Sequence, residues 1–440
     1  MRVHFIGIGG IGLSALARFL QYRGYEVSGS DIKSTPITDE LIKEGIKVNI
    51  PQDGSAIDGQ DLVIYSAAVQ NHNVEILEAK KQELLLLPRK EALSIIMQKT
   101  TNYCVCAAHG KSTTTAILSS ILQSSAIIGA ISKEFDSNFR YMDEVLAFEA
   151  DESDESFILS HPYCSIVLNC EPEHMEYYNY DEERFYEAYT KFLDIAKLRV
   201  INAEDPFLAN YKGYAIKLFP SKDINNIEFI IKDGEPYTKF SLKDYGQFEV
   251  WGFGVHIAID ASCAILAASL SMEFEQIREN LAKYKGIKKR FDIIQNHIKN
   301  TEGEKSFVLI DDYAHHPTEI IATLKSVQLY KKHVGIEKVI VVWQPHKFSR
   351  TLDNLEYFKK CFKGCDELII LPVWSVNEEH QDIDFAKEFT NYSTTLIDKV
   401  KAHLGMLELI KDEKIIGTID EGIVLGVGAG DITYQLRGTK

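Results

Sequence analysis

The sequence Val3-His4-Phe5-Ile6-Gly7-Ile8-Gly9-Gly10-Ile11-Gly12 joins a β-rich run to a glycine-rich loop. The stretch from Leu13 to Tyr22 is apolar at helical spacing and predicts a helix directly after the loop. Between a strand and a helix, G-x-G-x-x-G lets backbone N–H groups approach a pyrophosphate at the positive end of the helix. The alternative is a tight turn that needs glycine only for packing. The pattern favours a site for dinucleotide-like phosphates.

A carboxylate, Asp31, follows the second predicted strand, Glu26–Ser30. A carboxylate at this place usually meets a ribose hydroxyl. Taken alone, these features predict a nicotinamide-dependent dehydrogenase or a nucleotide-sensing module. Nothing later in the chain resembles a site for hydride transfer, however, and a second nucleotide-type loop lies downstream. Both alternatives stay open on the residues alone.

The order of strand, loop and helix recurs from near Asn102 and from Phe307. Strands that alternate with helices are typical of parallel sheets, so we predict an α/β fold. A polar link at 98–101 and a basic link at 286–290 predict three domains over 1–98, 99–289 and 290–440. Within Lys222–Glu249 the turn signal Asp233-Gly234 predicts a β-hairpin. The other strands are expected at Asp61–Ser66, Tyr103–Ala107, Val145–Glu149, Ser165–Cys170, Leu198–Asn202, Phe307–Ile310, Lys338–Trp343, Glu367–Pro372 and Gly422–Gly426.

Composition limits the function. The 440 residues are 45% hydrophobic and 25% charged, which is ordinary for a folded protein of two or three domains. A net charge of -16 argues against a broad nucleic-acid face and against docking on an anionic membrane. We expect reduced thiols at the seven cysteines, and we find neither a signal peptide nor a membrane span, so we expect a cytoplasmic protein.

A second phosphate loop is predicted at Ala107-Ala108-His109-Gly110-Lys111-Ser112-Thr113-Thr114-Thr115, between a buried strand and a helix. Its backbone N–H groups could cradle phosphates, Lys111 could reach the β and γ oxygens, and the Ser112 hydroxyl could bind Mg²⁺. The spacing is not a full Walker motif, because Val105 stands where its first glycine would be. The alternative is an ordinary helix start with a surface lysine.

Acidic and histidine residues follow two further strands. Five carboxylates lie within Glu149–Glu155, and a magnesium ion beside the phosphate loop would relieve their repulsion. A solvated acidic loop is the alternative. His174, flanked by carboxylates after the next strand, is a candidate second metal ligand.

His256 and Asp260 share one face of a predicted helix, where they could contact an adenine ring or cap the helix. The third segment places Asp311–Pro317 and Gln344–Arg350 after strands, where ligands bind in open α/β sheets. Cationic groups there could close over an anionic substrate and a transferred phosphoryl group. Surface charge is the alternative for each residue taken singly.

The ordered set of motifs resembles the Mur ligases of peptidoglycan synthesis over essentially the whole chain. The motifs are Gly7–Gly12, Ser66-Ala67-Ala68, His109–Thr115, Glu149–Phe157, Asn169–His174, Gly254–Asp260, Arg290-Phe291, Asp311–Pro317, Gln344–Arg350 and Gly428–Asp431. The resemblance implies a Rossmann-like N-terminal domain, a P-loop-like central ATPase domain and a Rossmann-like C-terminal domain. It also implies that ATP, with Mg²⁺, activates a carboxylate of UDP-N-acetylmuramate as an acyl phosphate that L-alanine attacks. A relative in this family instead adds a preformed tripeptide during recycling.

The resemblance implies a role for each matching residue. The first domain would bind the UDP substrate rather than NAD. Departures include Ala107 and Ala108 for the usual glycine and threonine, Ile257 and Asp260 for two asparagines, and Lys347 for arginine. We expect a monomer or weak homodimer. The implied sites are Gly9, Gly10, Ile11, Asp31 and Ser66 for UDP; His109, Gly110, Lys111, Ser112 and Thr113 for ATP; His256 and Asp260 near adenine; Ser112, Glu149 and His174 for metal; and Tyr313, His315, His346, Lys347 and Arg350 for the muramyl carboxylate and alanine.

Overall fold

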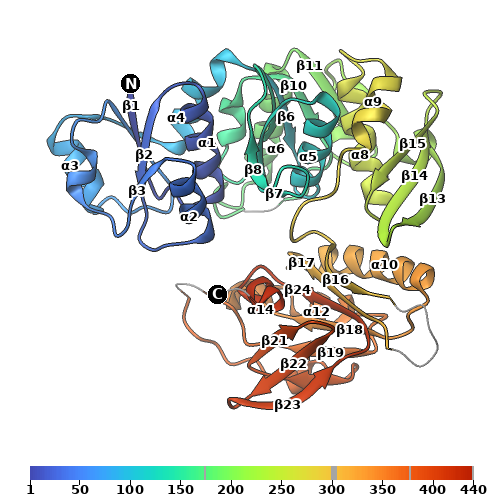
Figure 1. Cartoon of the computed structure of the whole chain (residues 1–440). Helices are drawn as coiled ribbons and strands as arrows, with labels where there is room; N and C mark the ends of the chain where they lie inside the picture. The colour runs from blue at the N-terminus through green and yellow to red at the C-terminus, as the bar shows by residue number, and fades with distance from the viewer. Residues whose placement is uncertain (173–174, 299–304, 376–377, 439–440) are drawn as a thin grey trace. The chain divides into compact units, whose positions relative to one another are not determined.

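The N-terminal part is a doubly wound sheet. The computed structural model describes residues 1–172, 175–298, 305–375 and 378–438. Five parallel strands lie in the order β3-β2-β1-β4-β5, with helices between them in the chain (Figure 1). The order reverses between β1 and β4, so the loops after these two strands meet at one edge. The elements are β1 Arg2–Ile6, α1 Ile11–Tyr22, β2 Glu26–Ser30, α2 Pro36–Lys43, β3 Lys47–Asn49, β4 Leu62–Tyr65, α3 Val74–Lys81, β5 Leu85–Pro88 and α4 Arg89–Ile96.

The central part is a seven-stranded sheet in the order β12-β11-β10-β6-β9-β7-β8. Its strands are parallel except β8, which pairs antiparallel with β7 at the edge. The core strand β6 is buried from Asn102 to Cys106, which explains its continuous apolar run. The elements are β6 Thr101–Cys106, α5 Lys111–Leu122, β7 Ser125–Ser132, β8 Ser137–Arg140, β9 Val145–Glu149, β10 Pro162–Val167, α6 Glu182–Ile195, β11 Leu198–Asn202, β12 Ile216–Leu218, α7 Pro220–Asp223, α8 Val255–Ala268 and α9 Phe274–Leu281.

The C-terminal part has a six-stranded sheet in the order β16-β17-β24-β18-β19-β20, with β16 antiparallel to β17. Trp343 is fully buried and packs among phenylalanine rings of the helices that cover the sheet. The elements are β16 Asp292–His297, β17 Phe307–Asp312, α10 Pro317–Val334, β18 Val339–Trp343, α11 Phe348–Asp353, α12 Leu355–Cys361, β19 Glu367–Ile370, α13 Phe385–Glu388, β20 Thr394–Leu396, β24 Gly422–Val427 and α14 Ile432–Arg437.

Two small antiparallel sheets complete the chain. The predicted hairpin is confirmed: β13 Ile224–Lys232 and β14 Glu235–Leu242 join at Asp233-Gly234, and β15 Gln247–Trp251 is the third strand. The other sheet, β21 Lys399–His403, β22 Met406–Lys411 and β23 Lys414–Ile419, was not expected from the sequence. Short 3-10 helices lie at Gly54–Ile57, Met97–Lys99, Ser156–Ser160 and Leu208–Asn210.

The chain divides into two compact units. One consists of residues 1–227, 240–250 and 256–287, and the other of 228–239, 251–255 and 288–440. Within the first unit, buried side chains join the N-terminal and central sheets. Arg18 of α1 donates to Asn138 Oδ1 of β8 (2.7 Å), and Asn138 Nδ2 donates to the Ile11 carbonyl oxygen (2.6 Å). This network holds the first turn of α1 against the central sheet.

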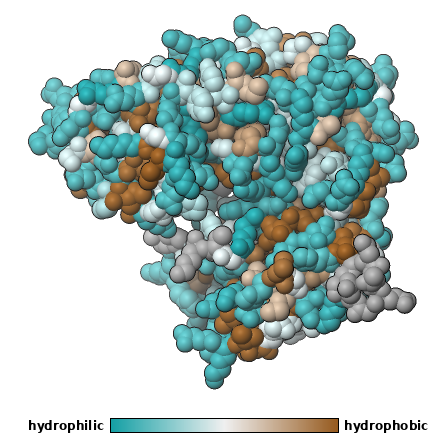
Figure 2. Space-filling model, viewed as in Figure 1, coloured by the Kyte–Doolittle hydropathy of each residue, from teal (hydrophilic) through white to brown (hydrophobic). Residues whose placement is uncertain are grey.

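The cysteines are reduced and the drawn face is mostly hydrophilic, as the composition led us to expect. All seven cysteines are free, six of them are buried, and burial raises the pKa of Cys104 to about 12 and that of Cys365 to about 11. Hydrophilic residues cover most of the face drawn in Figure 2, with smaller hydrophobic areas among them. Across the described residues, each helix is too short or too polar to cross a membrane.

Candidate active site

The glycine-rich loop lies where β1 and β4 end together. Gly7 has a φ of +81°, and a Cβ there would lie 3.2 Å from the Ser66 Cβ, so both backbone and space require glycine. The Gly9 N–H donates to Asp31 Oδ2 (2.9 Å), and Gly10 caps the N-terminus of α1. The structure thus brings together five residues predicted for the UDP substrate: Gly9, Gly10, Ile11, Asp31 and Ser66.

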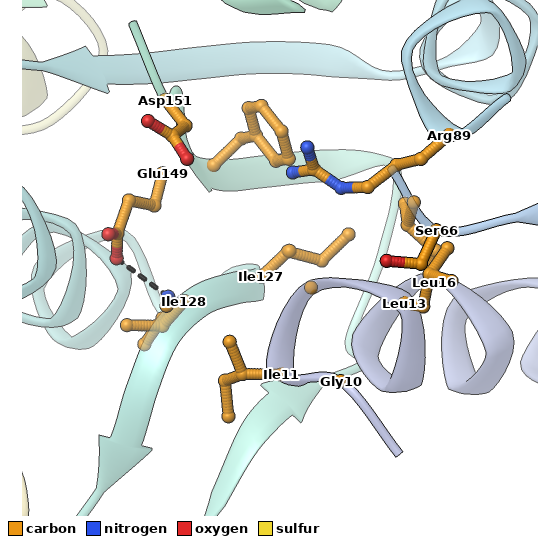
Figure 3. Close-up of a pocket in the computed structure, with 13 residues that line it drawn as sticks. Gly10, Ile11, Leu13, Leu16, Ser66, Arg89, Ile127, Ile128, Glu149 and Asp151 are labelled. Carbon is orange, nitrogen blue, oxygen red and sulfur yellow. Dashed lines mark hydrogen bonds between the residues drawn. The ribbon is translucent and has the colours of Figure 1, made fainter. Parts of the chain in front are cut away.

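A cavity of about 190 Å³ opens beside this loop. Figure 3 shows Arg89 and Ser66 on one side of it and Glu149 and Asp151 on another. The N-terminal sheet and its helices contribute Gly10, Ile11, Gly12, Leu13, Leu16, Ser66 and Arg89, and the central sheet contributes Ile127, Ile128, Gly129, Phe148, Glu149 and Asp151. The cavity therefore connects the glycine-rich loop with the acidic end of β9.

The second loop runs from β6 into α5. Gly110 has a φ of +88°, and a Cβ there would lie 2.8 Å from Asp260 Oδ1, so glycine is required and Asp260 of α8 lies against the loop. The side-chain amide of Asn169 clamps His109 by accepting from its N–H and donating to its carbonyl oxygen, both at 2.9 Å. His256, in the first turn of α8, is exposed.

The lysine of this loop is held by acceptors. Lys111 Nζ donates to Glu152 Oε1 (2.9 Å) and to the carbonyl oxygens of Ala107 (2.5 Å) and Ala108 (3.2 Å). Glu152 is almost fully buried, and burial raises the pKa of its carboxyl to about 7. Ser112 and Thr113 follow Lys111 in the first turn of α5, and the backbone N–H groups of such a turn could bind an anion at the helix start.

Two of the residues predicted to hold a metal lie in contact. Ser112 Oγ donates to Glu149 Oε1 (3.0 Å), and the Gly129 N–H donates to Glu149 Oε2 (2.6 Å). Burial raises the pKa of the Glu149 carboxyl above its ordinary value. The third predicted ligand, His174, lies outside the described residues. Among the described residues, no group of three or more His, Cys, Asp or Glu side chains could by itself hold a metal ion.

The donor set nevertheless suits one particular cation. A serine hydroxyl and a carboxylate are hard oxygen donors beside a phosphate loop. Mg²⁺ commonly takes only one or two protein ligands and completes its shell with phosphate oxygens and water. Ser112 and Glu149 therefore fit a magnesium ion that arrives with a nucleotide.

The C-terminal unit gathers the predicted aromatic and basic residues after β17 and β18. The ring of His315 lies 5.3 Å from that of Tyr313 and 6.0 Å from that of His346, between ring centres. Arg350 Nη1 donates to His346 Nδ1 (3.1 Å). Burial lowers the pKa of His315 to about 4, so its imidazole is neutral at pH 7 and can accept a proton.

Lys347 precedes α11 in a strained backbone conformation, with a φ of +67°. Its N–H donates to the Trp374 carbonyl oxygen (2.9 Å). The next turn is held by Glu378, which accepts from the Phe348 N–H (2.7 Å) and from the Ser349 hydroxyl (2.5 Å). These bonds keep His346 and Arg350 on the same side of the loop.

Sequence reasoning missed two charged groups at these sites, Arg89 in the cavity and Glu152 on Lys111. It placed Glu378 in a stretch that could border the amine pocket, but did not predict that Glu378 bonds to Phe348 and Ser349 in the loop that carries His346. Glu152 lies within the acidic run that the sequence singled out, but its burial and its bond to Lys111 depend on the fold. Arg89 begins α4 directly after the apolar strand β5, so its place at the carboxyl end of a strand was the one available signal.

Comparison with known proteins gives a consistent result. Profiles described as "Mur ligase family, catalytic domain" and "Mur ligase, glutamate ligase domain" match residues 2–101 and 289–419. The UDP-N-acetylmuramate–L-alanine ligase of Helicobacter pylori (strain P12) is 53% identical over 99% of this chain and 96% of that protein. The ligase of the same name from Campylobacter curvus (strain 525.92) is 52% identical over 99% of both.

Solved structures share the fold. The crystal structure of the UDP-N-acetylmuramate-alanine ligase MurC from Thermotoga maritima matches with a TM-score of 0.80 and 27% identity, over 100% of this chain and 98% of that one. A murein peptide ligase from Psychrobacter arcticus has the same fold, with a TM-score of 0.63 and 19% identity over 98% and 96% of the two chains.

Proposed function

Because the chain belongs to the Mur ligase family, we propose that it joins L-alanine to the carboxylate of UDP-N-acetylmuramate at the expense of ATP, in peptidoglycan synthesis. The observation that carries this proposal is the pair of phosphate-type loops, Gly7–Gly12 and Ala107–Lys111, in one compact unit with a cavity between the first loop and the acidic end of β9. A ligase that binds both a UDP-linked substrate and ATP needs two phosphate sites, whereas a dehydrogenase needs one.

The chemistry explains the need for ATP. A carboxylate does not react with an amine at neutral pH. One carboxylate oxygen bonds to the γ-phosphorus, the bond from that phosphorus to the bridging oxygen breaks, and ADP leaves. The nitrogen of alanine then bonds to the carbonyl carbon, phosphate departs and the nitrogen loses a proton. The products are an amide, ADP and phosphate.

The central residues serve the phosphoryl step in this proposal. His109, Gly110, Lys111, Ser112 and Thr113 hold the phosphates, and Lys111 offsets the negative charge that accumulates on the oxygens. Ser112 and Glu149 would hold one Mg²⁺ and His174 a second metal ion, and these ions would neutralise charge on the phosphate oxygens. His256 and Asp260 are assigned to the adenine side, and the position of Asp260 against Gly110 supports this.

The other two parts serve the remaining substrates. Gly9, Gly10, Ile11, Asp31 and Ser66 are assigned to the UDP group. Tyr313, His315, His346, Lys347 and Arg350 are assigned to the muramyl carboxylate and the incoming alanine, and a neutral imidazole of His315 or His346 takes the proton of the amine. We assign these roles to domains spanning 1–98, 99–289 and 290–440, in a cytoplasmic monomer or weak homodimer.

One experiment distinguishes L-alanine from the recycling tripeptide as the amine, and an ATP-consuming ligase from a protein that does not consume ATP. The protein is supplied with ATP, Mg²⁺ and UDP-N-acetylmuramate, together with either L-alanine or the tripeptide used in recycling. ADP release is followed and the product is weighed by mass spectrometry. We expect the L-alanine adduct. Efficient tripeptide addition with negligible alanine addition would assign the chain to the recycling reaction instead, and an absence of ADP release with either amine would refute the ligase.

A further inference from the structure

The cavity beside the glycine-rich loop contains an arginine that the described part of the molecule leaves without a partner. Arg89 is the first residue of α4, and its guanidinium extends into the cavity (Figure 3). Its Nε is buried and has no hydrogen-bond partner, and the guanidinium makes no salt bridge with any described residue. Arg89 as a whole is partly exposed, but a buried N–H without a hydrogen-bonding partner is unfavourable, and a ligand in the cavity could supply that partner.

The loop is shaped around this side chain. A Cβ on Gly12 would lie 3.2 Å from Arg89 Nε and 3.5 Å from both Cζ and Nη2, so the backbone of α1 packs closely on the guanidinium. A Cβ at position 12 would therefore require the guanidinium to shift by a few tenths of an ångström. The last glycine of the loop therefore makes room for the arginine, in addition to any approach of backbone to phosphate.

Opposite walls of the cavity carry groups of opposite charge. Arg89, the Ser66 hydroxyl and the positive end of α1 form a side that attracts anions, whereas Glu149 and Asp151 form a side that attracts cations.

We propose that Arg89 binds the carboxylate of the UDP-linked substrate, the group that the reaction activates, and holds it between the glycine-rich loop and the acidic end of β9. This inference rests on the proposed function. The backbone N–H groups of the glycine-rich loop are assigned the diphosphate, so the carboxylate would lie beyond the diphosphate in the same cavity, where Arg89 is the one cationic side chain among the described lining residues. The planar guanidinium matches the two oxygens of a carboxylate.

The test compares two nucleotide sugars by calorimetry. UDP-N-acetylglucosamine has the same uridine diphosphate and a closely similar sugar, but it lacks the lactyl carboxylate of UDP-N-acetylmuramate. Arg89→Gln should weaken binding of UDP-N-acetylmuramate about 10- to 100-fold, as expected for loss of a charge-assisted hydrogen bond, and should change UDP-N-acetylglucosamine binding less than about twofold. Lys81→Gln, an exposed residue of α3, removes the same charge and should change neither affinity.

A further variant keeps the test decisive if Arg89→Gln folds poorly. Arg89→Lys keeps the positive charge but loses the planar guanidinium that can bind both carboxylate oxygens. It should weaken UDP-N-acetylmuramate selectively, raise its KM and leave the KM for ATP unchanged. An equal loss for both sugars would assign Arg89 to the diphosphate and overturn the proposal, as would unchanged affinity for both. A wild-type protein that binds neither sugar would instead refute the proposed function.

Discussion

The ammonium of Lys111 lies 2.9 Å from the carboxylate of Glu152, in a salt bridge at the first turn of α5. A phosphate oxygen that takes the ammonium must compete with this carboxylate and with two backbone carbonyl groups. The strength of these acceptors therefore sets how firmly Lys111 is held before it reaches a nucleotide.

Replacing Lys111 with alanine should lower the rate of ADP release at least about 100-fold, because the charge on the transferred phosphoryl group loses its nearest cation. Affinity for UDP-N-acetylmuramate should change less than about twofold, since the glycine-rich loop that we assign to UDP follows a strand of a different sheet. Steady-state kinetics and calorimetry measure the two quantities. Lost affinity with retained turnover would mean that the two loops are assigned the wrong way round.

Glu152 should make stability depend on pH. Burial raises the pKa of its carboxyl from 4.5 to about 7, so between these values the folded protein binds more protons here than the unfolded chain. The contribution of this carboxyl to the free energy of unfolding therefore falls as pH rises through that window. Glu152→Gln removes the titration, and its melting temperature relative to the wild type should rise from pH 5 to pH 8.

The matched control for this measurement is Glu91→Gln on α4, which removes an exposed carboxylate. Its melting temperature should follow that of the wild type at every pH. Parallel curves for Glu152→Gln and the wild type would count against the raised pKa.

Replacing Glu149 with glutamine should raise the Mg²⁺ concentration for half-maximal rate about tenfold or more, because an amide is a poorer ligand than a carboxylate. His174→Ala should weaken a second metal and slow phosphoryl transfer. Magnesium titrations of ADP release measure both effects. Titrations that superimpose on that of the wild type would favour a solvated acidic loop over a metal site.

The amine should be selected by size. L-alanine should support ADP release best, with glycine and L-serine weaker, because a small pocket excludes the extra bulk of serine and discriminates a missing methyl group by about 1–3 kcal/mol. The ratio of kcat/KM for L-alanine to that for glycine should therefore lie between roughly 10 and 200. Equal kcat/KM values for all three amino acids would show that the pocket does not distinguish the methyl side chain.

The sequence predicted the elements whose local chemistry is distinctive. Glycines at positions 7 and 110 stand at positive φ, and Asp233-Gly234 forms the expected turn, because each depends on its own few residues. Arg89 was missed because its role depends on Gly12 and on a sheet formed from distant segments. Likewise, nothing near Ser349 indicated that its hydroxyl would donate to Glu378, since the two residues lie 29 positions apart in the sequence.

The burial of the native thiols has a practical consequence. Maleimide dyes react with thiolates, and the raised pKa values of the native cysteines keep these groups protonated. One cysteine introduced at an exposed position such as Lys81 should therefore react with a maleimide fluorophore faster than the native cysteines do. The natural chain can be labelled at a chosen site without first removing any of its own cysteines.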